Sequence, residues 1–152
     1  MVIAENVPLE PNINKLSAAL ESTRDQTLKM FYWLDRAALV FLLTDKAKDY
    51  KHLTGPKKIY LDNTNLIYAL GHENADIGNV RETFFMNQTR VGHDVISSSV
   101  SDFQIVGLTF EVGGRNKKQK QLQGVENEYV VKDDIEKGHL NVIPLWMIGL
   151  LY

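Results

Sequence analysis

Apolar residues near the start of the chain recur at helical spacing. Ile13, Leu16 and Leu20 lie three and four positions apart, which places them on one face of a helix. Ser22, with Asp25 three positions later, is typical of the start of a second helix. The apolar positions that share a face of this second helix are Leu28, Phe31, Leu34 and Ala38.

The run LVFLL follows from Leu39 and is rich in strand-forming residues. The order is therefore a helix, a tight turn, a helix and a strand, as in a winged helix-turn-helix, in which the second helix enters the major groove of DNA. The alternative is a helical hairpin that serves only packing. The polar residues expected on the exposed face of the second helix, able to donate hydrogen bonds to phosphates or bases, are Thr23, Arg24, Gln26, Thr27 and Lys29.

The charged stretch TDKAKDYKHLTGPKK contains Gly55-Pro56 and is typical of a wing tip or an interdomain loop. We place a domain boundary here, with residues 1–56 as a partial winged helix-turn-helix and residues 57–152 as a second domain. That second domain begins with a strand at Ile59-Tyr60-Leu61 and a short helix ended by Gly71.

A longer helix is predicted from Ile77 to Thr89. The pattern then changes to strands between Val95 and Val112, and Gly107 is placed to turn a hairpin between the last two. NEYVVKDD predicts a further strand and IPLWMIGLLY a final short helix. The fold class is thus α/β, with mixed α and β elements.

Three acids of the second half are candidates for chemistry. Glu82 lies on the long helix, Asp102 opens one hairpin strand and Glu111 lies on its partner, so the hairpin brings the last two together. Two carboxylates on neighbouring strands can hold Mg²⁺, and a lysine two residues after the second acid would orient or deprotonate the attacking water. That position is Gly113, and nearby bases reach the acids only if the chain curls back.

Each of these features also has a structural explanation. Glu82 could be a solvated helix acid, Asp102 a turn residue before a strand and Glu111 a surface acid paired with a lysine. Gly113 and Gly114 could end a strand with positive φ, and the basic run after them would then begin a solvated helix.

The composition narrows the classes of function. A net charge of −2 argues against global attraction to nucleic acid, so such binding would depend on local basic patches. The absence of cysteine excludes disulfides and thiolate zinc sites. No apolar segment is long enough to span a bilayer, so we expect a cytoplasmic protein with no membrane partner.

Six ordered stretches together resemble the C-terminal region of a family of bacterial and archaeal AAA-type ATPases over nearly the whole chain. They are PLEPNINKLSAALESTRDQTLKMFYWLDRAALV, KKIYLDNTNLIYALG, NVRETFFMNQ, DFQIVGLTFEVGGRNKKQKQ, YVVKDDIEKG and IPLWMIGLLY. The resemblance implies a winged helix followed by a domain similar to the restriction-endonuclease-like, PD-(D/E)xK fold. No GxxxxGK[ST] motif occurs, so the chain holds no ATP site of that kind.

The resemblance places Glu82 at the acid of the leading helix, and Asp102 and Glu111 at the two metal-binding acids. Gly113 replaces the expected lysine, which implies a degenerate and inactive site, with Mg²⁺ bound only if the site is active. The basic residues that could then hold a phosphate backbone are Arg115, Lys117, Lys118 and Lys120.

The hypothesis favoured by the sequence is a non-catalytic module that binds double-stranded DNA. One alternative is a divergent Mg²⁺-dependent nuclease in which Lys117 or Lys118 replaces the missing base. Another is a protein-interaction domain that docks onto an ATPase domain or a second copy, for which exposed surfaces around Phe84, Phe85, Trp146 and Leu150 would matter, although we expect these residues in the core. VIAENVP resembles only the end of a first winged-helix segment, so the chain is expected to begin partway through a domain, which would favour dimerisation.

Overall fold

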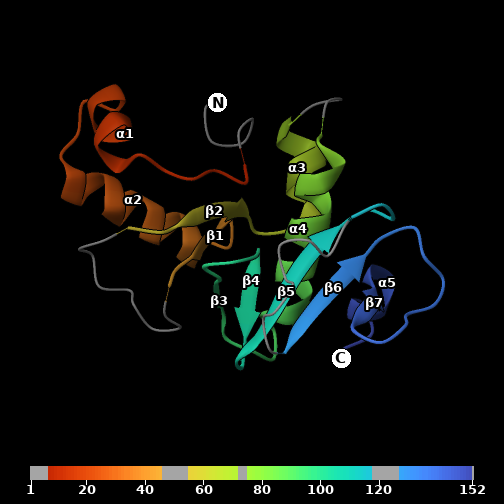
Figure 1. The fold of residues 1–152 in the computed structure, drawn as a ribbon. Coiled ribbons are helices and arrows are strands. Elements are labelled where there is room, and N and C mark those ends of the chain that lie inside the picture. The colour runs from red at the N-terminus through yellow and green to blue at the C-terminus, as the bar shows by residue number, and fades with distance from the viewer. Residues whose placement is uncertain (1–6, 46–54, 72–74, 118–126, 152) are drawn as a thin grey trace. The chain divides into compact units, whose positions relative to one another are not determined.

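The computed structural model describes residues 7–45, 55–71, 75–117 and 127–151. The chain divides into two compact units, Met1–Ala75 and Asp76–Tyr152 (Figure 1). The first holds helices and a hairpin, and the second holds a five-stranded mixed sheet with helices. The mixed α/β class is therefore confirmed.

Two helices open the first unit, as the spacing predicted. Helix α1 (Ile13–Ala19) is capped by Asn12, and helix α2 (Arg24–Arg36) is capped by Thr23, one residue after the predicted start. Ile13 and Leu28 are buried. The predicted faces are wrong at their ends, because Leu20 is 53% exposed and Ala38 follows α2 as an exposed residue with positive φ.

Strand β1 (Val40–Leu43) follows α2 and pairs antiparallel with β2 (Lys58–Leu61). The predicted order of helix, helix and strand is thus present. Helix α3 (Thr64–Gly71) comes next, and the Asn63 side chain accepts a hydrogen bond from the Leu66 N–H within its first turn. The boundary predicted near Gly55-Pro56 falls inside the β1–β2 hairpin of the first unit.

The second unit begins with helix α4 (Ile77–Thr89), which has the predicted bounds and is capped by Asp76. Its sheet has the order β3-β4-β5-β6-β7. The strands are β3 (Val95–Ser97), β4 (Phe103–Ile105), β5 (Leu108–Gly113), β6 (Glu128–Lys132) and β7 (Val142–Pro144). Neighbours are antiparallel from β3 to β5 and parallel from β5 to β7.

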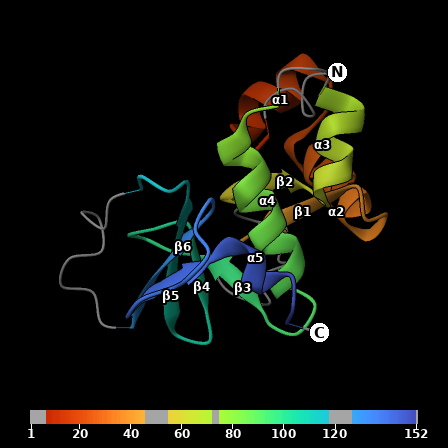
Figure 2. The ribbon, with the colours of Figure 1, turned by 90° about the vertical axis from the view of Figure 1, so that its right-hand side faces the viewer.

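Helix α4 packs on one face of this sheet (Figure 2). Phe85 is fully buried, and its ring centroid lies 5.3 Å from that of Phe103 on β4 and 5.3 Å from that of Phe110 on β5. Tyr129 on β6 stacks on Phe110. Because side chains alternate along a strand, this aromatic core on the α4 side directs the neighbours of Phe103 and Phe110 to the opposite face.

The short helix α5 (Leu145–Ile148) ends the unit, as predicted. Leu145 and Ile148 are buried, but Trp146 is 54% exposed and Leu150 72% exposed, so the prediction that these two belong to the core is wrong. Among the described residues, no helix combines the length and the apolar character needed to cross a bilayer.

Candidate active site

The β4–β5 hairpin brings two of the predicted acids together. Val106 and Gly107 form its turn with φ of 49° and 79°, the conformation that two-residue hairpin loops favour. Phe103 pairs with Phe110, so Asp102 is next in register with Glu111, on the face away from α4. An open cavity of about 450 Å³ is lined by Ser99, Val100, Ser101, Asp102 and Glu111.

Glu111 is 2% exposed, which contradicts the alternative that it is a surface acid. Both of its carboxylate oxygens have partners. The Ser101 hydroxyl donates to Oε2, and the Lys117 amine lies 2.6 Å from Oε1. A buried carboxylate requires such partners, because its charge is otherwise costly to remove from water.

Asp102 carries a strongly perturbed carboxyl. The pKa of Asp102 is raised from 3.8 to about 6, with burial as the largest cause and the charge of Glu82 as the next. The Val112 N–H donates a hydrogen bond to Oδ2 of Asp102 at 2.8 Å, which lowers the pKa of Asp102. The charge of Glu111 raises this pKa, and the charge of Lys117 lowers it. The charges of Glu82 and Glu111 therefore both act on Asp102.

The chain curls back after Gly113, which is the condition under which a nearby base was expected to reach these acids, and Lys117 is the base that does so. The Lys117 N–H donates to the Gly114 carbonyl at 2.9 Å, which closes a turn directly after β5. The turn reverses the chain and returns the Lys117 side chain to Glu111. The amine that is absent from the strand at Gly113 is thus supplied from a position four residues further along.

Gly113 makes room for the Lys117 side chain. A Cβ atom at Gly113 would lie 2.7 to 2.9 Å from Cδ, Cγ and Cβ of Lys117, closer than carbon atoms can approach. The alternative that Gly113 and Gly114 end the strand with positive φ is contradicted, because the positive-φ glycines of the described residues are Gly55 and Gly107. The absence of a side chain, rather than an unusual backbone conformation, is what this position requires.

The charge state of Lys117 follows from its neighbours. Burial lowers the pKa of the amine, but the hydrogen bond and charge of Glu111, together with the charges of Asp102 and Glu82, outweigh burial and raise it. The amine is therefore an ammonium near neutral pH. Its side chain is 35% exposed, so the ammonium can donate hydrogen bonds to a ligand while it remains beside Glu111.

The carboxylates of Asp102 and Glu111 fit Mg²⁺ better than they fit metals that require many protein ligands. Within the described ranges, no group of three or more His, Asp or Glu side chains is arranged to hold a metal ion. Mg²⁺, however, keeps several waters and is commonly bound through one or two carboxylates and substrate phosphates. Asp102 and Glu111, which line one open cavity, could supply those carboxylates.

The polar residues predicted on the exposed face of α2 do not all lie there. Thr27 is 1% exposed and its hydroxyl bonds to the hydroxyls of Ser17 and Ser22, so the prediction that Thr27 lies on the exposed face is wrong. Thr23 and Gln26 form a reciprocal capping box, in which each side chain accepts from the other residue's backbone N–H.

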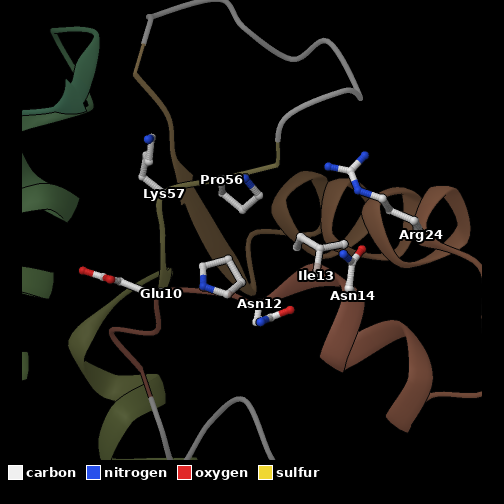
Figure 3. A pocket seen from close by; sticks show the side chains of 8 residues that line it. Glu10, Asn12, Ile13, Asn14, Arg24, Pro56 and Lys57 are labelled. Atoms are coloured by element: carbon white, nitrogen blue, oxygen red, sulfur yellow. The ribbon is translucent and has the colours of Figure 1, made fainter.

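Arg24 and Lys29 are the remaining members of this set. Lys29 is exposed. Arg24 is half-buried and lines an open cavity of about 500 Å³ together with Glu10, Asn12 and Lys57 (Figure 3). The cavity contains both signs of charge, since Glu10 and Lys57 line it beside Arg24.

The basic segment after β5 is described only in its first part. Arg115 is exposed in the turn that carries Lys117. Lys118 and Lys120 lie outside the described residues.

The sequence predictions did not include Ser101. Its hydroxyl contacts both the Phe110 carbonyl, at 2.9 Å, and Glu111. Its position next to Asp102 was the available signal, because a residue beside one acid of a hairpin lies near the acid of the facing strand.

Comparisons of the chain with protein-family models, with curated proteins and with solved structures find no match.

Proposed function

We propose that the second unit is a Mg²⁺-dependent phosphodiesterase that cleaves nucleic acid. The observation that carries this proposal is that Asp102 and Glu111 line one cavity and that the Lys117 amine lies 2.6 Å from Glu111. Titratable groups that perturb one another in a cavity are candidates for a functional site. A purely structural role accounts poorly for acids held together against their repulsion.

Asp102 and Glu111 would hold the metal. When bound, Mg²⁺ would offset the negative charge of the phosphate and lower the pKa of a water molecule. Ser101 holds the Glu111 carboxylate in place through Oε2, and the Val112 N–H holds that of Asp102. These two hydrogen bonds keep both acids oriented before a ligand arrives.

Lys117 would act as an ammonium. Because its pKa is raised, it cannot remove a proton from water near neutral pH, but it can donate hydrogen bonds to a phosphate oxygen as negative charge develops. In the hydrolysis a water oxygen forms a bond to phosphorus and the ester P–O bond breaks, while one proton of the water is released to solvent and the leaving oxygen takes up a proton in return. Arg115, exposed on the same turn, is placed to contact the adjoining phosphate backbone.

The test is cleavage of supercoiled plasmid, single-stranded DNA and RNA by the full chain with and without Mg²⁺, in wild type and Asp102→Asn. We expect the variant to lose at least about 100-fold in rate, the factor that corresponds to roughly 3 kcal/mol of charge stabilisation. Asp94→Asn, which changes an exposed acid of the same unit, is the matched control. The proposal fails if none of the three substrates is cut, or if Asp102→Asn cuts as fast as wild type.

A second candidate function is the binding of double-stranded DNA through α2. It is favoured by Lys29, which is exposed and has no ion pair within the described part of the chain. Since Thr23, Gln26 and Thr27 serve the local fold, this function would depend on Arg24 and Lys29. Salt-dependent binding of a DNA duplex by the wild-type chain is the measurement that tests it.

A further inference from the structure

Arg81 connects α4 to the turn that carries Lys117. Its guanidinium is bonded to two consecutive acids after β6, with Nε 2.9 Å from Asp133 and Nη2 3.1 Å from Asp134. The Arg81 side chain is only 15% exposed. Charge-assisted bonds from one guanidinium to two carboxylates fix its orientation more firmly than a single ion pair would.

The same guanidinium lies against the backbone of Gly114. A Cβ atom at Gly114 would be 2.9 Å from Nη1 and 3.3 Å from Cζ of Arg81, so the group packs where a side chain would otherwise be. Gly114 is also the residue whose carbonyl accepts from the Lys117 N–H. Arg81 therefore supports the first residue of the turn from outside.

Other contacts hold the turn from the β6 side. The Asp133 N–H donates to the Gly113 carbonyl at 2.9 Å, and the Lys132 amine lies 3.5 Å from the Arg115 carbonyl. Asp133 is thus bonded both to Arg81 and to the last residue of β5. The turn is enclosed between the guanidinium and the end of β6.

We propose that Arg81 is a positioning residue that holds the turn of residues 114–117 so that the Lys117 amine stays beside Glu111. The effect on cleavage rests on the proposed phosphodiesterase function, but the placement of the amine does not. In the contacts described above, Arg81 is bonded to Asp133 and Asp134 but to neither Asp102 nor Glu111, so it acts on the site through the turn. The charge of its neighbour Glu82 acts on Asp102, so the same turn of α4 affects both the turn of residues 114–117 and the acids.

The test compares Arg81→Lys and Gly114→Ala with wild type. Lysine keeps the positive charge but cannot bond both aspartates and cover Gly114, whereas alanine at Gly114 displaces the guanidinium and leaves every charged group in place. The measurement is the rate of acetylation of the Lys117 amine, followed by peptide mass spectrometry without metal or nucleic acid. Exposed Lys29 is the internal standard, and Arg90→Met, at the other end of α4, is the control variant.

We expect acetylation of Lys117 to become roughly tenfold faster in both variants, which corresponds to about 1.4 kcal/mol of lost contacts to Glu111. The rate in Arg90→Met should equal that of wild type. An unchanged rate at Lys117 in either variant, with a thermal unfolding transition showing that the variant is folded, overturns the proposal. Faster acetylation in a chain that cuts no nucleic acid supports the positioning role and contradicts the phosphodiesterase alone.

Discussion

Helix α2 of the first unit and the β4–β5 hairpin of the second both carry polar residues that the sequence predicted to be functional. The two sets differ in the groups to which these residues are bonded. On α2, Thr23 and Gln26 bond to each other's backbone. At the hairpin, Asp102 and Glu111 lie side by side despite their like charges, and Glu111 is bonded to an amine from outside the strand. Polar groups that complete a helix terminus are explained by folding, whereas acids gathered at a cavity require a further explanation.

The comparison is tested most severely at Lys117. Lys117→Met should slow metal-dependent cleavage by about 100-fold or more, the usual cost of removing one donor that stabilises developing charge. Mg²⁺ binding, measured by calorimetry, should tighten, because Glu111 loses the cation that is bonded to Oε1. If Lys117 served only the fold, its replacement would weaken both the cleavage and the binding of Mg²⁺.

A relocated lysine sharpens this prediction. Gly113 faces the same side of β5 as Glu111, so Gly113→Lys returns an amine to the strand. It is combined with Lys117→Gly, which removes the Lys117 carbon atoms that a Cβ at Gly113 would meet. We expect the double variant to recover part of the lost rate, with Lys137→Met, an exposed lysine of the same unit, as the control. Equal rates in wild type and Lys117→Met would show that the amine has no part in the chemistry.

The next largest effect is expected on stability and follows from the raised pKa of Asp102. Between 3.8 and about 6, the folded chain keeps a proton on Asp102 that the unfolded chain has already released. The stability that this group contributes is therefore full below about pH 4 and is lost as the pH rises through about 6. Urea unfolding of wild type and Asp102→Asn from pH 4 to pH 8 measures the stability that Asp102 contributes. The free energy of unfolding of wild type, relative to the variant, should fall across this window, and a flat difference would contradict the shift.

The smallest effect is expected on α2. Changing Arg24 and Lys29 to glutamate should weaken the binding of duplex DNA by less than about tenfold and lower the salt slope by about 2, as the loss of two phosphate contacts implies. Fluorescence anisotropy at several salt concentrations measures both quantities. Complete loss of binding at low salt would reverse the comparison and move nucleic-acid recognition to the first unit.

Much of the fold could be predicted from local pattern. Helix α4 has the predicted bounds because Asp76 caps it, and Gly107 closes the predicted hairpin because its positive φ suits the turn. These features depend on residues close in sequence. The pairing of Asp102 with Glu111 followed from the hairpin in the same way.

The sequence left open whether Lys117 or Lys118 reaches the acids, because spacing along a strand takes no account of a chain reversal. The turn after Gly114 depends on contacts with Arg81 and on Asp133, which are more than 15 residues away along the chain in either direction. Thr27 was misplaced for a similar reason. Its hydroxyl is buried by a bond to Ser17 of α1, which a helical pattern within α2 alone does not reveal.

The turn that carries Lys117 separates the amine from the hydrogen-bonded ladder of the sheet. Substitutions within it can therefore alter or remove the positive charge without rebuilding a strand, whereas Glu111 lies within β5 and Asp102 directly before β4. Searches that demand a lysine at a fixed distance from the second acid will overlook chains built in this way, and a glycine at that distance, followed by a tight reversal and a lysine, is a pattern worth seeking in its place.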